Sequence, residues 1–597
     1  MSTGDFKLRA VNEWASHDPF GKLKGADASG RGVSVVGASG AVELRAARGG
    51  YASFRVLVEG EGEYRLKVTM GGGLEVDLYR AWYHHMRKEE GEQPTYWPDA
   101  LVPVKARQAF ALPDPDNNVP GQTVQEFWVD VYVPADAGPG TVKGKVTLSS
   151  GQAKTELRVA LDLLDLVIPD EPCVQMDHNS YGCRGCSSAY PKRFRGAKRP
   201  PKYWEKTIEV LHNRYRIFHE HRGLYHNLGY GHSGDADPIY RPETSGRGRD
   251  LAVTDWTLYD AHYGPLLDGS CFAAASPGMP RPRRAAKPVH AIYTPFNPDW
   301  PADYLWWGES GYEVEMTRGL RQFDEHLRAK GWTGTLIEFF FNHKKRYHWY
   351  EWDGDEPKYE KDDPYHEKMA AFLHDTVKGS PVRWKYRMDA SWRQKAEWNS
   401  LEGAVDMWVC GGFIRWYQEE VKPVIARGDI VWNYGSYPPV TAATSGVLEN
   451  LYRTWVRNLA GFCAWNATGG GNAEPYFFDC DGCPTVVVYP GERFGIAGPV
   501  PSVRLKVLRN GIQDIDLIDR AAKAAGSIEA LREELIGTYP IENVWDPPPR
   551  AARELPTEDW DSENLRAEHE PIMEAQAGLD PQWWSEMRER ALSGEVQ

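Results

Sequence analysis

Two adjacent carboxylates, Asp355 and Glu356, lie near the end of the segment Trp349-Tyr-Glu-Trp-Asp-Gly-Asp-Glu-Pro357. Acids that only solvate a helix usually stand among Lys and Ser, whereas this pair is framed by aromatic residues and followed by proline. Because paired carboxyl groups can donate and accept protons in one reaction, we interpret Asp355 and Glu356 as candidate catalytic residues. The alternative is that both acids cap the helix that follows them.

Cleavage of a glycosidic bond is a reaction that such a pair could perform. It needs one acid to protonate the leaving oxygen and a second group to stabilise the oxocarbenium-like centre, and two separated carboxylates usually do this. Neighbouring residues fit that separation less easily. They fit substrate-assisted cleavage, in which the 2-acetamido oxygen of the sugar is the nucleophile and the second carboxylate orients the acetamido nitrogen. Glu356 acting with Asp389 or another strand-end carboxylate is the alternative.

Composition limits the partners of the chain. The 597 residues include 24 Trp and 30 Tyr, which suits both large cores and aromatic platforms that stack on sugar rings. A formal net charge of −14 disfavours nucleic acid, whose phosphates require a basic surface. We see neither an apolar signal-peptide core at the N-terminus nor an uninterrupted apolar stretch of membrane-spanning length. We therefore expect no membrane span and a cytoplasmic protein, or a secreted one if the chain is a trimmed form.

Three regions follow from the hydrophobic pattern. Short alternating strands with Gly, Pro and Asp between them, such as Phe127-Trp-Val-Asp-Val-Tyr-Val, predict an N-terminal β-sandwich over residues 1–170. Strands that alternate with amphipathic helices predict a central (β/α)₈ barrel over residues 171–500. The remaining residues, 501–597, are typical of a short C-terminal helical region. We thus expect a multidomain chain that combines an all-β and an α/β unit.

The eight barrel strands can be placed along the chain. We predict them near Val174, Gly223, Val289, Leu336, Lys385, Val405, Ile430 and Phe462, with clear helices at 204–219, 312–330, 366–378 and 450–459. The segment Gly229-Tyr-Gly-His-Ser-Gly234 has the spacing of a dinucleotide-binding motif, but no helix opens after it, so we interpret it as a loop.

Several stretches together resemble glycoside hydrolase family 123 and its relatives with a DUF4091 domain. They are Val124-Gln-Glu-Phe-Trp-Val-Asp-Val-Tyr-Val-Pro, Ile337-Glu-Phe-Phe-Phe-Asn-His-Lys, Asp355-Glu-Pro357 and, above all, Pro501-Ser-Val-Arg-Leu-Lys-Val-Leu-Arg-Asn-Gly-Ile-Gln-Asp. The resemblance implies a sandwich before a barrel and an exo-acting β-N-acetylgalactosaminidase without a catalytic cofactor. It also implies that Asp355 orients the acetamido group and that Glu356 is the general acid and base. The substrate of such an enzyme would be an oligosaccharide or a glycoconjugate. The alternative from another functional class is a non-catalytic carbohydrate-binding protein.

Polar and aromatic residues near the barrel strands are candidate sugar contacts, because barrel sites form at strand ends. For each of them, core packing is the alternative. We predict that they are His178, Arg222, Tyr293, Asn342, Lys344, Asp389, Trp432, Tyr434, Trp465 and Asn466.

Four of the eight cysteines form two Cys-x-Gly-Cys turns, one at Cys183 and Cys186 and the other at Cys480 and Cys483. The first turn follows the predicted first strand and the second follows the eighth, and these strands are neighbours in a closed barrel. Two such turns are a usual ligand set for structural zinc, so we predict a zinc ion held by these four residues, with disulfides or free thiols as the alternatives.

Overall fold

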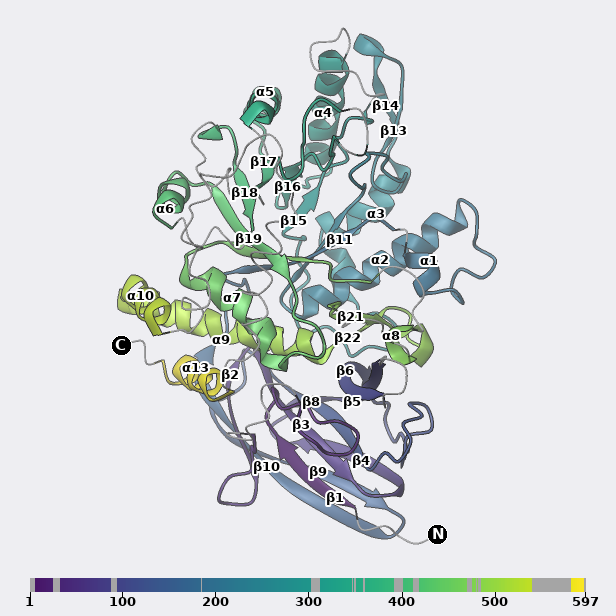
Figure 1. The fold of residues 1–597 in the computed structure, drawn as a ribbon, viewed down its shortest axis with the longest axis vertical. Helices are drawn as coiled ribbons and strands as arrows, with labels where there is room; N and C mark the ends of the chain where they lie inside the picture. Colours follow the sequence, from purple (N-terminus) through teal and green to yellow (C-terminus); the bar gives the residue numbers. More distant parts are fainter. Residues whose placement is uncertain are drawn as a thin grey trace.

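A computed structural model of the chain describes residues 6–24, 33–86, 94–183, 185–301, 312–345, 347, 350–357, 360–390, 401–411, 418–469, 475–478, 480, 485–538 and 581–594. Two units dominate it, an N-terminal β-sandwich and an α/β barrel (Figure 1). In the described part of the chain, none of the helices combines the length and the apolar character that a membrane crossing needs.

The sandwich consists of two five-stranded sheets, ordered β1-β3-β8-β5-β6 and β2-β10-β9-β4-β7. Its strands are β1 (Lys7–Val11), β2 (Val42–Arg48), β3 (Gly50–Glu59), β4 (Gly62–Met70), β5 (Glu75–Met86), β6 (Thr95–Pro103), β7 (Phe110–Leu112), β8 (Val124–Val133), β9 (Gly140–Ser150) and β10 (Ala153–Val167). The central strand β8 turns Phe127, Val129 and Val131 into the core between the sheets. Its other face is buried as well, because Trp128 packs into the core of the barrel.

The barrel is a sheet of eight parallel strands in the order β12-β11-β20-β19-β18-β17-β16-β15. β12 and β15 lie side by side at the remaining seam, so the barrel is nearly closed. The strands are β11 (Gln175–Tyr181), β12 (Leu224–Leu228), β15 (Ala291–Tyr293), β16 (Leu336–Phe339), β17 (Arg383–Ala390), β18 (Met407–Cys410), β19 (Ile430–Ser436) and β20 (Gly461–Trp465). All eight coincide with or adjoin the predicted positions.

Helices cover the outside of the barrel (Figure 1). They are α1 (Cys186–Ala189), α2 (Lys202–Glu220), α3 (Thr257–Leu267), α4 (Tyr312–Ala329), α5 (Asp363–Thr376), α6 (Gln418–Ala426) and α7 (Val447–Val456). Smaller elements are the hairpin β13 (Glu243–Ser245) and β14 (Ala252–Asp255), helix α8 (Pro475–Phe478) and the hairpin β21 (Val488–Pro490) and β22 (Pro499–Pro501). The four helices predicted from the sequence correspond to α2, α4, α5 and α7.

Among the described residues, three helices follow the barrel: α9 (Val503–Ala525), α10 (Ile528–Thr538) and α13 (Pro581–Ser593). Helix α9 begins at Ser502, whose side chain accepts a hydrogen bond from Leu505 N, and ends at Gly526 in the left-handed conformation. It lies between the sandwich and the barrel (Figure 1) and is buried on all sides from Val503 to Asp519. The predicted boundary after residue 170 lies between β10 and β11, whereas the one after residue 500 lies within β22. Helix α9 packs as an internal element, not as an appendage.

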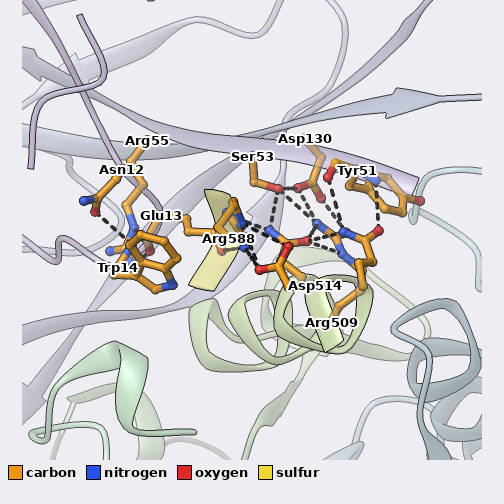
Figure 2. A network of polar contacts seen from close by, with 12 residues as sticks. Asn12, Glu13, Trp14, Tyr51, Ser53, Arg55, Asp130, Arg509, Asp514 and Arg588 are labelled. Carbon is orange, nitrogen blue, oxygen red and sulfur yellow. Dashed lines mark hydrogen bonds and ion pairs between the residues drawn. The ribbon is translucent and has the colours of Figure 1, made fainter. Parts of the chain in front are cut away.

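A buried polar cluster fastens α9 to the sandwich (Figure 2). We call Glu13, Ser53, Asp130, Lys506, Arg509 and Asn510 the α9 clasp. Both oxygens of Asp130 on β8 accept hydrogen bonds from Arg509, at 2.7 and 3.0 Å, and Lys506 donates a further one at 2.6 Å. Asn510 donates to Glu13 at 2.7 Å, and Arg588 of α13 donates to Glu13 and to Asp514. Burying these charges is tolerable because each one is paired.

Candidate active site

The carboxyl ends of the barrel strands surround a pocket of about 200 Å³. Its lining comes from the strand ends and from the loops after β12 and β16, as expected for a site in a parallel barrel. We call it the carboxylate pocket, and it is lined by Asn179, Tyr181, Leu228, His232, Tyr293, Phe340, Lys344, Asp355, Glu356, Asp389, Tyr434, Cys463 and Trp465. Both predicted catalytic acids are among these residues.

The loop after β16 holds the two acids against Lys344. The backbone N–H groups of Gly354 and Asp355 donate to the carbonyl of His343 at 3.0 and 3.2 Å. Glycine is required at position 354, because a Cβ there would lie 2.5 Å from the Phe341 carbonyl oxygen. Glu356 has a φ of 49°, a left-handed conformation that is strained for a residue with a side chain and that often marks a functional site.

Charged neighbours fix the ionisation of Asp355. Lys344 Nζ lies 3.2 Å and His232 Nε2 3.1 Å from Asp355 Oδ2, and Lys344 also forms an ion pair with Glu356. Burial alone would raise the pKa of Asp355, but the Lys344 ammonium and the His232 imidazole outweigh it and hold the pKa below its usual value. The Asp355 side chain is 8% exposed and that of Glu356 is 25% exposed, so Glu356 is the more open to the pocket.

Arg387 lies under the pocket and organises two of its walls. It donates two hydrogen bonds to Asp389, at 2.8 and 3.1 Å, and one each to the Tyr293 hydroxyl and to Glu338, both at 2.8 Å. Burial, only partly offset by Arg387, raises the pKa of Asp389 to about 6. Because Arg387 donates to Oδ1 and to Oδ2, both oxygens of Asp389 accept hydrogen bonds from its guanidinium.

The floor beneath Arg387 is polar too. His226 of β12 lies 3.1 Å from Asp177 of β11 and stacks on Tyr293 with a ring separation of 3.8 Å. Burial raises the pKa of Asp177 to about 7 and lowers that of His226 to about 4. The floor therefore carries little net charge near neutral pH and acts as a rigid support for the pocket.

Aromatic side chains form the remaining wall. Tyr181 and Trp465 meet edge to face with ring centroids 4.2 Å apart, and Tyr434 lines the pocket from β19. An aromatic wall opposite carboxylates is the usual environment for a sugar ring, whose C–H face stacks on aromatic rings while its hydroxyl groups bind acids and amides.

Five of the ten predicted sugar contacts line this pocket. They are Tyr293, Lys344, Asp389, Tyr434 and Trp465. Asn342 lies one step behind the wall, where its side chain accepts a hydrogen bond from Tyr181 at 3.3 Å. Asn466 follows Trp465 in the chain but is outside the lining.

Three predicted contacts are corrected by the structure. His178 points out of the barrel, because it stacks on Phe218 of α2 and contacts the Tyr437 hydroxyl. Arg222 precedes β12, at the opposite end of the barrel, where it donates to Asp516 of α9 at 2.6 Å. Trp432 is 1% exposed and fills the barrel interior below Tyr434, near His226.

The sequence analysis missed other residues of the pocket. Asn179 and Tyr181 share the inward face of β11 with Asp177, and the alternation of that strand could have found them. His232 comes from the segment Gly229-Tyr-Gly-His-Ser-Gly234, which the sequence analysis interpreted only as a loop. Arg387 could have been suspected from its position two residues before Asp389 on one strand.

The predicted zinc site is only partly within the described residues, because Cys483 lies outside them. The described cysteines are free thiols. Cys183 donates to Asp237 at 2.9 Å and belongs to the barrel core, whereas Cys480 packs with Met86 and Val440. In the part of the chain that the structure describes, no group of three or more His, Cys, Asp or Glu residues could hold a metal. The four-cysteine site stays a prediction, which elemental analysis of the purified protein would decide.

Comparisons with known proteins bear on the fold. No protein-family model matches the sequence, and no curated protein matches it. A family 123 glycoside hydrolase from Clostridium perfringens, studied for glycolipid glycan hydrolysis, has a TM-score of 0.59 at 13% identity and covers 98% of this chain and 99% of its own. A Parabacteroides merdae beta-glucuronidase reaches a TM-score of 0.30 at 8% identity over 78% of this chain and 50% of its own, which is too low to carry an argument. The resemblance to family 123 inferred from sequence motifs is thus confirmed at the level of the fold.

Proposed function

We propose that the protein is a glycoside hydrolase that releases a terminal β-linked N-acetylgalactosamine by a retaining, substrate-assisted mechanism. The observation that carries the proposal is the position of Asp355 and Glu356, side by side in a pocket with aromatic walls at the carboxyl end of the barrel. The fold shared with a family 123 glycoside hydrolase supports it.

In the first step, protonated Glu356 gives its proton to the glycosidic oxygen, and the bond from that oxygen to the anomeric carbon breaks. The acetamido oxygen of the same sugar attacks the anomeric carbon and closes a five-membered ring. Asp355, held ionised by Lys344 and His232, accepts a hydrogen bond from the acetamido N–H and offsets the positive charge that develops there.

In the second step, Glu356 is a carboxylate and removes a proton from a water molecule. The resulting oxygen attacks the anomeric carbon, the bond to the acetamido oxygen breaks, and the sugar leaves with its original β configuration. The two acids thus need opposite protonation states when the substrate reacts.

The second candidate is a glycosidase in which Asp389 is the nucleophile. Asp389 shares the pocket with Glu356. However, its two oxygens accept hydrogen bonds from Arg387 at 2.8 and 3.1 Å, which makes the carboxylate a poor nucleophile. The geometry therefore favours the substrate-assisted route.

Hydrolysis of aryl β-glycosides tests the proposal. We expect turnover of the 2-acetamido-2-deoxygalactoside and at most trace turnover of the plain galactoside, together with strong inhibition by a thiazoline that mimics the cyclised intermediate. Equal turnover of both glycosides, or a covalent adduct with a 2-fluoro sugar, would favour Asp389. Sugar binding without any hydrolysis would favour a carbohydrate-binding protein.

A further inference from the structure

The ammonium of Lys344 contacts both acids of the proposed catalytic pair. It lies 3.2 Å from Asp355 Oδ2 and forms a closer ion pair with Glu356 Oε2. The lysine is well anchored, because its backbone N–H donates to the His232 carbonyl at 3.1 Å and its side chain is only 11% exposed. Lys344, a predicted sugar contact, lines the pocket, and its ammonium also contacts the two carboxylates.

These two contacts have opposite consequences for the reaction. A cation at this distance stabilises the ionised form of a carboxyl group. This suits Asp355, which must be an anion to receive the acetamido N–H. It opposes the function of Glu356, which must carry a proton before the glycosidic bond can break.

The other groups that face the pair do not relieve this conflict. His232 contacts Asp355, and the charge of Arg387 is taken up by Asp389 and Glu338. Burial raises the pKa values of Tyr181, Tyr293, Tyr434 and Cys463, so these pocket residues stay neutral. Asp389, with its pKa of about 6, adds negative charge at neutral pH. Among the described pocket residues, Lys344 is the cation that forms an ion pair with Glu356.

We propose that Lys344 is a positioning residue that controls when Glu356 acquires its proton. In the free enzyme its ammonium keeps Asp355 and Glu356 ionised together. When a neutral 2-acetamido sugar fills the pocket, the ammonium remains with Asp355 and loses Glu356, which then takes one proton from the solvent. That proton is the one later transferred to the glycosidic oxygen. This inference rests on the proposed function of the pair.

Exclusion of water explains the direction of the change. In the open pocket, solvent screens the two negative charges, and one ammonium suffices to hold them. A bound sugar displaces that water, so two carboxylates beside one ammonium become unfavourable. Glu356 takes the proton because it then has no cationic partner, whereas Asp355 keeps its contacts with Lys344 and His232.

The pH dependence of kcat/KM on the aryl 2-acetamido glycoside tests the inference. In Lys344→Met the alkaline limb should move to higher pH by about 1 to 3 units, since Glu356 then keeps its proton without an opposing cation. Lys344→Arg preserves the charge and should keep the limb near its original position. Lys385→Met, which removes a lysine paired with Asp406 away from the pocket, is the matched control and should change nothing. A purely structural role of Lys344 would lower kcat/KM without moving the limb.

A second measurement does not need turnover. Infrared difference spectra between the parent and Glu356→Gln report the protonated carboxyl band of Glu356 in the free protein. We expect this band to persist to a higher pH by about 1 to 3 units in the Lys344→Met background. If the band shifts in the Lys344→Met background but the parent hydrolyses no 2-acetamido glycoside, the proposed function is refuted and the role of Lys344 in the ionisation of Glu356 is retained. An active parent in which neither the limb nor the band moves would overturn the inference about Lys344.

Discussion

The α9 clasp and the carboxylate pocket use the same kinds of side chain in different ways. In the clasp, Asp130 is 1% exposed and both of its oxygens are occupied by Arg509, with Lys506 and Ser53 as further donors. In the pocket, Lys344 and His232 both bind Oδ2 of Asp355, and Glu356 remains a quarter exposed. A carboxylate whose oxygens are occupied by several protein donors holds elements together, whereas a carboxylate that can accept further hydrogen bonds can bind a substrate and react.

The largest expected effect comes from Glu356→Gln. The amide is nearly isosteric but has no proton to give, so hydrolysis of a disaccharide substrate should fall about 10³-fold while the fold persists. Activated aryl glycosides should suffer less, because their leaving groups need less protonation. Steady-state kinetics with both substrates and circular dichroism would check this, and full activity on the disaccharide would rule Glu356 out as the acid.

Arg509→Met, in contrast, should lower the stability of the protein and leave the KM unchanged. It leaves Asp130 buried without its main partner, which should lower the free energy of unfolding by about 3 to 5 kcal/mol. Denaturant unfolding would measure this loss, and the KM of the folded fraction should not change. Arg520→Met on the same helix is the control, because Arg520 is an exposed donor to a backbone carbonyl. Equal destabilisation by the two variants would contradict a special role for the clasp.

A low pH should remove the stability that the α9 clasp supplies. Arg509 and Lys506 outweigh the effect of burial and hold the pKa of Asp130 well below its value in the unfolded chain. Stability from this group is complete above the unfolded pKa of about 4 and is lost as the pH falls below it. Unfolding measured from pH 6 to pH 3 should therefore show a slope that is smaller in Asp130→Asn. An unchanged slope would show that other carboxyl groups control acid unfolding.

Tyr434→Phe should give the smallest effect. A phenol on the pocket wall can make one hydrogen bond to a sugar, worth about 0.5 to 1.5 kcal/mol, so KM should rise about 2- to 10-fold with little change in kcat. Tyr263→Phe, a buried phenol on α3, is the control and should leave KM unaltered. A fall in kcat with constant KM would instead place Tyr434 in the chemical step.

Local sequence patterns predicted the eight barrel strands and the acidic pair, because periodicity and an unusual aromatic frame are local signals. They failed where a contact depends on which way a residue faces. His178 and Asn179 are consecutive on β11, yet only Asn179 faces the pocket. Arg222 was near the correct strand but at the wrong end of it. Partners distant in sequence, such as His232 with Asp355, could not be paired without the fold.

The position of α9 late in the chain affects how the protein is made. Asp130 belongs to a domain whose strands are complete at Val167, but its cation Lys506 is synthesised 376 residues later. At ordinary ribosomal rates this is a delay of about 20 to 75 seconds. During this time β8 presents an acidic, half-covered face that native contacts do not yet protect. We therefore expect the sandwich to reach its final packing only after the barrel has left the ribosome, and nascent chains arrested before Pro501 to be cut readily by proteases within residues 124–133.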